Sequence, residues 1–163
     1  MIKNIVLLIL LMIISYGTFS IDNGKINKLV IHVTDTDDKH DIGAHEIDVL
    51  HRYFNNWENG CGYHYVIRRT GQIEICRDES LMGAHVRGAN EKSLGIVWVG
   101  REDMTKTQYD ALKRLIKRLL NKHNLTVEDV YPHNHFESAK IQNKSCPNMD
   151  VELLKKEIKN EGF

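Results

Sequence analysis

Two short runs of apolar residues constrain the fold of this chain most strongly. They read LVIHV at 29–33 and LGIVWVG at 94–100. Neither run alternates with polar residues, as a strand with one face in water does. A strand that is apolar on both faces belongs in the middle of a sheet whose two sides are covered. The two runs therefore predict an α/β domain with helices packed on a central sheet.

The other expected elements follow from apolar periodicity and turn residues. The strongest helix, at 107–123, has Thr105 or Thr107 as its N-cap. A Thr-Gly pair at 70–71 predicts a hairpin, and 78–93 and 133–150 are expected to be loops. The order β-α-β-β-loop-β-α-β-α indicates a mixed central β-sheet flanked by helices. The expected strands are 29–33, 63–69, 72–76, 94–100 and 130–133, and the expected helices are 44–57, 107–123 and 151–159.

The first twenty residues, MIKNIVLLILLMIISYGTFS, are typical of a secretory signal. An early lysine is followed by an apolar run and then by small residues, so cleavage is expected after Ser20. The run is short for a membrane span, which needs roughly twenty apolar residues, although an uncleaved anchor is an alternative. We expect a signal peptide at 1–20, a single domain at 21–163, and a secreted or periplasmic protein without stable membrane association.

Charge gives no sign of a nucleic-acid partner. The chain of 163 residues has 22 Lys and Arg against 22 Asp and Glu, whereas nucleic-acid-binding proteins usually show a basic excess or a basic face. We therefore expect no nucleic-acid partner. A monomeric domain is a separate expectation. Nine histidines are a high number for this length and require an explanation.

Export makes Cys61, Cys76 and Cys146 candidates for disulfide formation. Pairing outward from the turn at 70–71 sets Cys76 opposite Tyr65, four residues from Cys61. Four extended residues cover about 13 Å, beyond the roughly 7 Å limit between the Cα atoms of a disulfide. A Cys61–Cys76 disulfide is therefore not expected, unless a bulge narrows the gap. Cys146 is then an odd thiol, and metal ligation would explain it.

Cys146 lies in HNHFESAKIQNKSCPNMD, residues 133–150, after two histidines. Zinc hydrolases use three ligands from His, Cys or carboxylate residues and leave one position open. His32, His133 and Cys146 offer such a set. A strand points residues two apart to the same side, so His135 could replace His133. Each of the three also has an ordinary interpretation, as a core histidine, a strand-end residue and a small buried hydrophobe.

Three motifs follow one another in the chain: GYHYVIRRTGQIEICRDES from 62, GAHVRGANEKSLGI from 83 and KSCP from 144, with IHVTDT at 31–36 before them. Together they resemble the zinc-dependent N-acetylmuramoyl-L-alanine amidases of type 2. Phage T7 lysozyme and the peptidoglycan recognition proteins share the fold of this family. The likeness runs from about residue 28 to 157, nearly all of the expected mature chain. It implies a zinc hydrolase built on a mixed sheet.

The resemblance also implies roles for individual residues, each by its match to a family motif. The implied ligands are the two histidines and the cysteine named above. A tyrosine and a lysine match the family's catalytic positions, and the histidine of GAH matches a position on the substrate groove. The assignments are metal ligands His32, His133 and Cys146, catalytic Tyr63 and Lys144, and substrate-binding His85.

The implied reaction is hydrolysis of the amide between N-acetylmuramic acid and the L-alanine of the stem peptide, a bacteriolytic activity. Peptidoglycan and its muropeptides are the expected partners, and Zn2+ is the expected cofactor. Tyr63 and Lys144 would stabilise the oxyanion or transfer a proton to the leaving amine. The alternative is a non-catalytic, muropeptide-binding module of the same fold. A purely structural zinc is a third possibility, and it requires a fourth ligand, for which His135 is the candidate.

Overall fold

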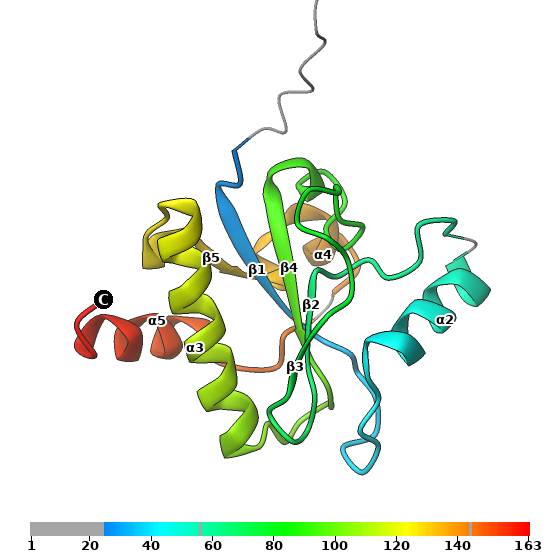
Figure 1. The fold of residues 1–163 in the computed structure, drawn as a ribbon, viewed down its shortest axis with the longest axis horizontal. Coiled ribbons are helices and arrows are strands. Elements are labelled where there is room, and N and C mark those ends of the chain that lie inside the picture. Colours follow the sequence, from blue (N-terminus) through cyan, green and yellow to red (C-terminus); the bar gives the residue numbers. More distant parts are fainter. Residues whose placement is uncertain (1–24, 56, 144) are drawn as a thin grey trace, which may run out of the picture.

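The computed structural model describes residues 25–55, 57–143 and 145–163. The expected signal peptide at 1–20 and the catalytic candidate Lys144 lie outside these residues. The described chain forms a five-stranded sheet in the order β3-β2-β4-β1-β5, with helices packed beside it (Figure 1). The predicted mixed α/β architecture is confirmed. Within the described part of the chain, no helix is both long and apolar enough to cross a membrane.

The centre of the sheet consists of β1 (Lys28–Val33) and β4 (Ser93–Trp98). These strands pair in parallel, with His32 opposite Val97. Every residue of the two strands except Lys28 is buried, as the uninterrupted apolar runs predict. β5 (Val130–Pro132) pairs in parallel with the other side of β1. His32 therefore lies on a strand that has a neighbour on each side.

A hairpin completes the sheet beyond β4. β2 (Tyr65–Ile67) runs parallel to β4 and antiparallel to β3 (Ile73–Ile75), which makes the sheet mixed. Both strands are shorter than the predicted 63–69 and 72–76. Gly71 in the turn has a φ of 83°, a conformation that glycine adopts without steric cost.

Cys61 and Cys76 form a disulfide, so the expectation drawn from the hairpin was wrong. The register of the hairpin is shifted by one residue from the expected one, because Ile75 and not Cys76 lies opposite Tyr65, and the Cys76 amide donates to the carbonyl oxygen of His64. This shift alone would still leave Cys61 and Cys76 too far apart. The error was to assume an extended chain from Cys61 to Tyr65. β2 begins only at Tyr65, and the residues before it are not in a strand. The two cysteine Cα atoms are consequently 5.9 Å apart.

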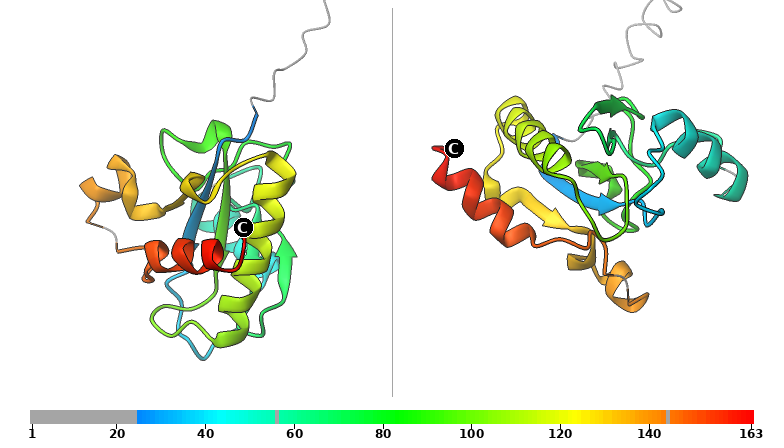
Figure 2. Two further views of the ribbon diagram at one scale, coloured as in Figure 1. Left: turned by 90° about the vertical axis from the view of Figure 1, so that its left-hand side faces the viewer. Right: turned by 90° about the horizontal axis from the view of Figure 1, so that it is seen from below.

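Two helices, α3 (Lys106–His123) and α5 (Val151–Asn160), lie side by side on one face of the sheet (Figure 2). α3 begins at a capping box, in which the Thr105 hydroxyl accepts from the Gln108 amide and the Gln108 side chain accepts from the Thr105 amide. Thr105 is thus the N-cap, one of the two predicted positions. The helices pack on alternate strand residues, which are Leu29, Ile31 and Val33 of β1 and Leu94, Ile96 and Trp98 of β4.

The opposite face of the sheet receives the side chain of His32, because residues alternate along β1. A smaller core lies on this face and includes Ile47 of α2 (Ala44–Asn55). The amphipathic pattern of 44–57 predicted a helix correctly but overestimated its contact with the core. Tyr53 and Phe54 are 77% and 72% exposed, because α2 stands at the side of the sheet and faces it only over its first turns (Figure 1).

The segment 133–150, expected to be a loop, contains two short helices. η3 (His133–His135) follows β5 directly, and α4 (Glu137–Ile141) follows η3. α4 has one buried residue, Ala139, and so leaves no apolar periodicity in the sequence. Two further 3-10 turns precede strands, η1 (Asn90–Lys92) before β4 and η2 (Val127–Asp129) before β5.

Candidate active site

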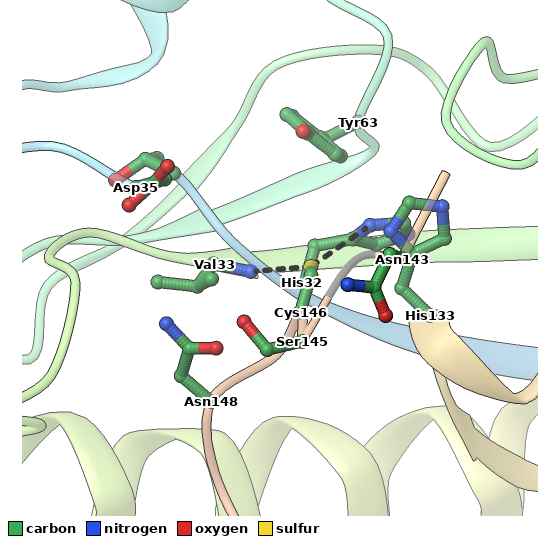
Figure 3. Close-up of a pocket in the computed structure, with 10 residues that line it drawn as sticks. His32, Val33, Asp35, Tyr63, His133, Asn143, Ser145, Cys146 and Asn148 are labelled. Carbon is green, nitrogen blue, oxygen red and sulfur yellow. Dashed lines mark hydrogen bonds between the residues drawn. The ribbon is translucent and has the colours of Figure 1, made fainter. Parts of the chain in front are cut away.

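His32, His133 and Cys146 come together at one end of the central strands (Figure 3). One ligand atom from each residue lies within 4.8 Å of the others. The Sγ atom of Cys146 is 3.9 Å from Nδ1 of His32, and the two imidazole rings have centroids 4.5 Å apart. The topology explains this meeting, because β5 pairs with β1 up to Pro132 opposite Ile31. His32 follows Ile31 within β1, and His133 is the first residue after β5.

His135 is directed away from this cluster, although a strand would have placed it beside His133. β5 ends at Pro132, and the chain turns into η3 at His133. The imidazole of His135 packs against Tyr131, with ring centroids 4.9 Å apart, and against Phe136. The assumption of a continuing strand was therefore wrong, and the histidine that faces Cys146 is His133.

Three hydrogen bonds hold the Cys146 segment against the sheet. The amide of Val33 donates to Cys146 Sγ at 3.3 Å, and the amide of Asn134 donates to the Cys146 carbonyl oxygen. The indole N–H of Trp98, which is fully buried, donates to the carbonyl oxygen of Pro147. The thiol group is thus placed by β1, β4 and η3 together. An N–H that donates to sulfur favours the thiolate form of the cysteine.

Tyr63 lies on the loop before β2, with its ring centroid 5.1 Å from that of His32. It lines the same cavity, of about 400 Å³, as the three clustered residues. Burial raises the pKa of its phenol, and the neighbouring charge of Cys146 acts in the same direction. The hydroxyl is therefore protonated near neutral pH and can donate a hydrogen bond into the cavity.

The remaining wall of this cavity is formed by polar loop residues that the sequence did not single out. Thr34 and Asp35 follow β1, and Asn143, Ser145 and Asn148 flank the Cys146 segment. Such residues are common in loops, so no pattern distinguishes them before the fold is known. Lys144 belongs to the residues that the structure leaves undescribed, but its two neighbours both line the cavity.

His85, predicted to bind substrate, lies behind His32. Its Nδ1 is 3.0 Å from Nε2 of His32, and its Nε2 is 3.3 Å from the hydroxyl of Ser93. Burial lowers the pKa of His85 to about 3, with the nearby His64 as the second cause. The residue also lines a second cavity, of about 310 Å³, together with His133. A substrate contact by His85 stays a prediction, whereas its contact with His32 is observed.

Arg77 has a structural position behind the site. It is 7% exposed, and its guanidinium donates to the carbonyl oxygens of Cys61, Asn59 and Met82. These bonds join the two loops that surround the disulfide.

Comparisons with known proteins agree with this geometry. A family model described as N-acetylmuramoyl-L-alanine amidase matches residues 22–149. The endolysin of Escherichia phage T7 is 31% identical over 131 residues, which cover 76% of this chain and 81% of the endolysin. The endolysin of Klebsiella phage KP32 is 31% identical over 133 residues, which cover 77% and 82% of the two chains.

Solved structures show the same relationship. N-acetylmuramoyl-L-alanine amidase LysC from Clostridium intestinale URNW superimposes with a TM-score of 0.71 at 30% identity, over 84% of this chain and 87% of LysC. Drosophila PGRP-LB, at 24% identity and a TM-score of 0.63 over 85% and 82% of the chains, shares the fold. The chain is therefore an amidase that belongs to the N-acetylmuramoyl-L-alanine amidase family.

Proposed function

We propose that this protein is an exported, zinc-dependent peptidoglycan amidase. It hydrolyses the amide between N-acetylmuramic acid and the L-alanine of the stem peptide. One observation carries the proposal: two imidazoles and a thiol converge within 4.8 Å at a cavity that Tyr63 also lines. The family match supports the choice of substrate, because the matching model is described by this reaction.

The donor set fits zinc in chemistry, and the one donor–donor distance available is close to the spacing in a zinc site. Imidazole and thiolate are the ligands that zinc prefers, and three protein ligands with an open position are typical of catalytic sites. Tetrahedral zinc keeps its nitrogen and sulfur ligands about 3.3–3.6 Å apart. The observed 3.9 Å between Cys146 Sγ and His32 Nδ1 is close to that value. When bound, zinc acts as a Lewis acid that activates water and polarises a carbonyl oxygen.

The chain's own residues complete the site. The hydroxyl of Tyr63 donates a hydrogen bond to the oxygen on which negative charge develops. It can do so because burial raises the pKa of the phenol and keeps it protonated at neutral pH. Lys144, which matches the catalytic lysine of the family motif, supplies a cation that stabilises the same oxygen. These roles require no fourth protein ligand.

Export is the second part of the proposal. The apolar leader at 1–20 directs secretion and is removed after Ser20, which leaves a monomeric domain from residue 21. The Cys61–Cys76 disulfide supports this location, because disulfides persist in oxidising compartments and are rare in the cytosol. N-terminal sequencing and light scattering of the secreted protein test both points. A mature chain that begins at Met1 would contradict cleavage.

The decisive experiment combines metal content with product release. Purified wild type and Cys146→Ser are analysed for zinc and incubated with peptidoglycan, and released peptides are identified by mass spectrometry. We expect one zinc per wild-type chain and free peptides with an N-terminal L-alanine, and neither from Cys146→Ser. Zinc without release would indicate a structural ion. Binding to peptidoglycan with neither zinc nor release would indicate a recognition module and refute the proposal.

The control variant is His135→Ala. His135 packs on Tyr131, away from the clustered ligand atoms. This variant should therefore retain both its zinc and its activity. Loss of zinc from His135→Ala would show that the wrong histidine has been assigned.

A further inference from the structure

We propose that His85 and Ser93 form a hydrogen-bond relay that fixes the tautomer of His32, so that its Nδ1 lone pair faces the other two ligands. The inference rests on the proposed zinc site, and it assigns both residues a positioning role. Neither residue lines the cavity that Tyr63 and the three clustered residues share. In the relay they act on the metal through His32.

The direction of the relay follows from the single proton of a serine hydroxyl. Ser93 Oγ is 2.7 Å from the carbonyl oxygen of Ala89, which can only accept, so the hydroxyl proton is donated there. The same oxygen lies 3.3 Å from Nε2 of His85. Because the hydroxyl proton of Ser93 is already donated to Ala89, Ser93 Oγ must be the acceptor in this second hydrogen bond. His85 therefore carries a proton on Nε2 and presents a lone pair on Nδ1.

The hydrogen bond between His85 and His32 fixes the tautomer of His32 in the same way. Nδ1 of His85 is 3.0 Å from Nε2 of His32, and one of the two atoms has to donate. Because His85 presents a lone pair, the proton belongs to Nε2 of His32. The lone pair of neutral His32 is then on Nδ1, the atom 3.9 Å from Cys146 Sγ. The reverse direction would place a proton on Nδ1 and close that nitrogen to a metal.

Packing keeps the ring of His85 in the orientation that the relay needs. Two glycines leave the space that it occupies: a Cβ on Gly95 would lie 2.6 Å from Cγ of His85, and a Cβ on Gly83 would lie 2.5 Å from its Cδ2. The ring of His64 meets it edge-on. Its backbone amide donates to Oδ1 of Asn90, which also accepts from the following amide. These contacts therefore hold the imidazole of His85 against His32.

This arrangement gives a function to Ser93, which is 1% exposed at the start of β4. Metal-ligating histidines usually donate their other N–H to an acceptor, and loss of that acceptor typically weakens metal affinity about 10–100-fold. Here the acceptor is a second histidine, whose own tautomer depends on a buried serine. Two residues outside the cavity, one on a loop and one at the start of β4, thus prepare His32 to bind the metal.

The test uses a matched pair of substitutions, His85→Asn and His85→Leu. The two replacements have nearly the same shape and make nearly the same void, but the Asn Oδ1 occupies the position of the imidazole Nδ1 and can accept from His32. Zinc affinity is measured by competition with a chromophoric chelator. We expect His85→Leu to lose about 10–100-fold in affinity and His85→Asn to recover most of it. Equal losses, or no loss in either variant, would overturn the relay.

A second readout does not depend on the metal. Long-range ¹H–¹⁵N correlation spectra of the metal-free protein report which nitrogen of each histidine carries the proton. In the wild type we expect the Nε2–H tautomer at both His32 and His85. A dominant Nδ1–H form of His32 in the wild type would overturn the proposal. If the wild type bound no zinc, the proposed function would fail, and these spectra would still decide the relay.

Discussion

Removal of the Cys61–Cys76 disulfide should destabilise the protein by about 3 kcal/mol. The two cysteines are separated by 15 residues in the sequence. For a loop of this length, the chain-entropy relation gives about 10 cal/mol/K, or about 3 kcal/mol at 25 °C. The loop contains β2, the hairpin turn and β3, so the disulfide restricts the unfolded chain over the segment that must fold back on itself. Cys61 is fully buried, and its replacement by alanine adds a small packing loss.

The assay is urea unfolding of Cys61→Ala/Cys76→Ala beside the wild type, both with a chelator so that metal binding does not contribute. With an m-value of about 2 kcal/mol/M, the midpoint should fall by about 1.5 M urea. Wild type treated with a phosphine reductant is the control, because it lacks the disulfide but keeps both side chains. If reduced and oxidised wild type unfolded within about 0.5 kcal/mol of each other, the entropic reasoning would be refuted.

Three further predictions concern single side chains. Tyr63→Phe should bind zinc like the wild type but lose about 100-fold in kcat, because only the donated phenolic proton is removed; an unchanged kcat would exclude that role. Gln108→Ala should cost about 2–4 kcal/mol in chemical unfolding, since the fully buried amide donates to two main-chain carbonyl oxygens, whereas the exposed Gln72→Ala should change stability little. Hydrogen bonds from Lys113 and then Lys117 lower the pKa of Glu161 to about 2. Because this folded-state pKa lies below the ordinary 4.5, the stabilisation is complete above that pH and disappears as the pH falls toward 2. Glu161→Gln should therefore flatten the stability profile between these values, and an NMR titration of Glu161 with a midpoint near 4.5 would contradict the assignment.

The central layer of the fold was predictable from local sequence. The apolar runs at 29–33 and 94–100 predicted buried strands because neither alternates with polar residues, His32 being the one polar residue within them, and both became the middle strands. The helix from Lys106 to His123 was predictable because its cap and its apolar stripe lie within one segment. α4 was not, since five residues with one buried alanine carry no periodicity.

The sequence predicted which residues form the candidate site, but it did not predict how they are placed. The sequence motifs indicated His32, His133 and Cys146 as a group, and the structure brings their ligand atoms within 4.8 Å. The family resemblance assigned His133, but a strand through both histidines left His135 open, and the end of β5 shows why only His133 faces Cys146. The disulfide likewise needed the conformation of the residues before β2.

The sequence by itself therefore determined the strands, the long helix and the identity of the metal-binding candidates, because each depends on neighbours in the chain or on a recognisable motif. Only the tertiary structure decided where side chains point when the chain leaves a strand. His85 illustrates the difference: its motif indicated a groove residue, while packing against Gly83 and Gly95 places its ring against His32. Side-chain direction outside regular elements depends on contacts between segments that are distant in sequence, and a local pattern does not contain them.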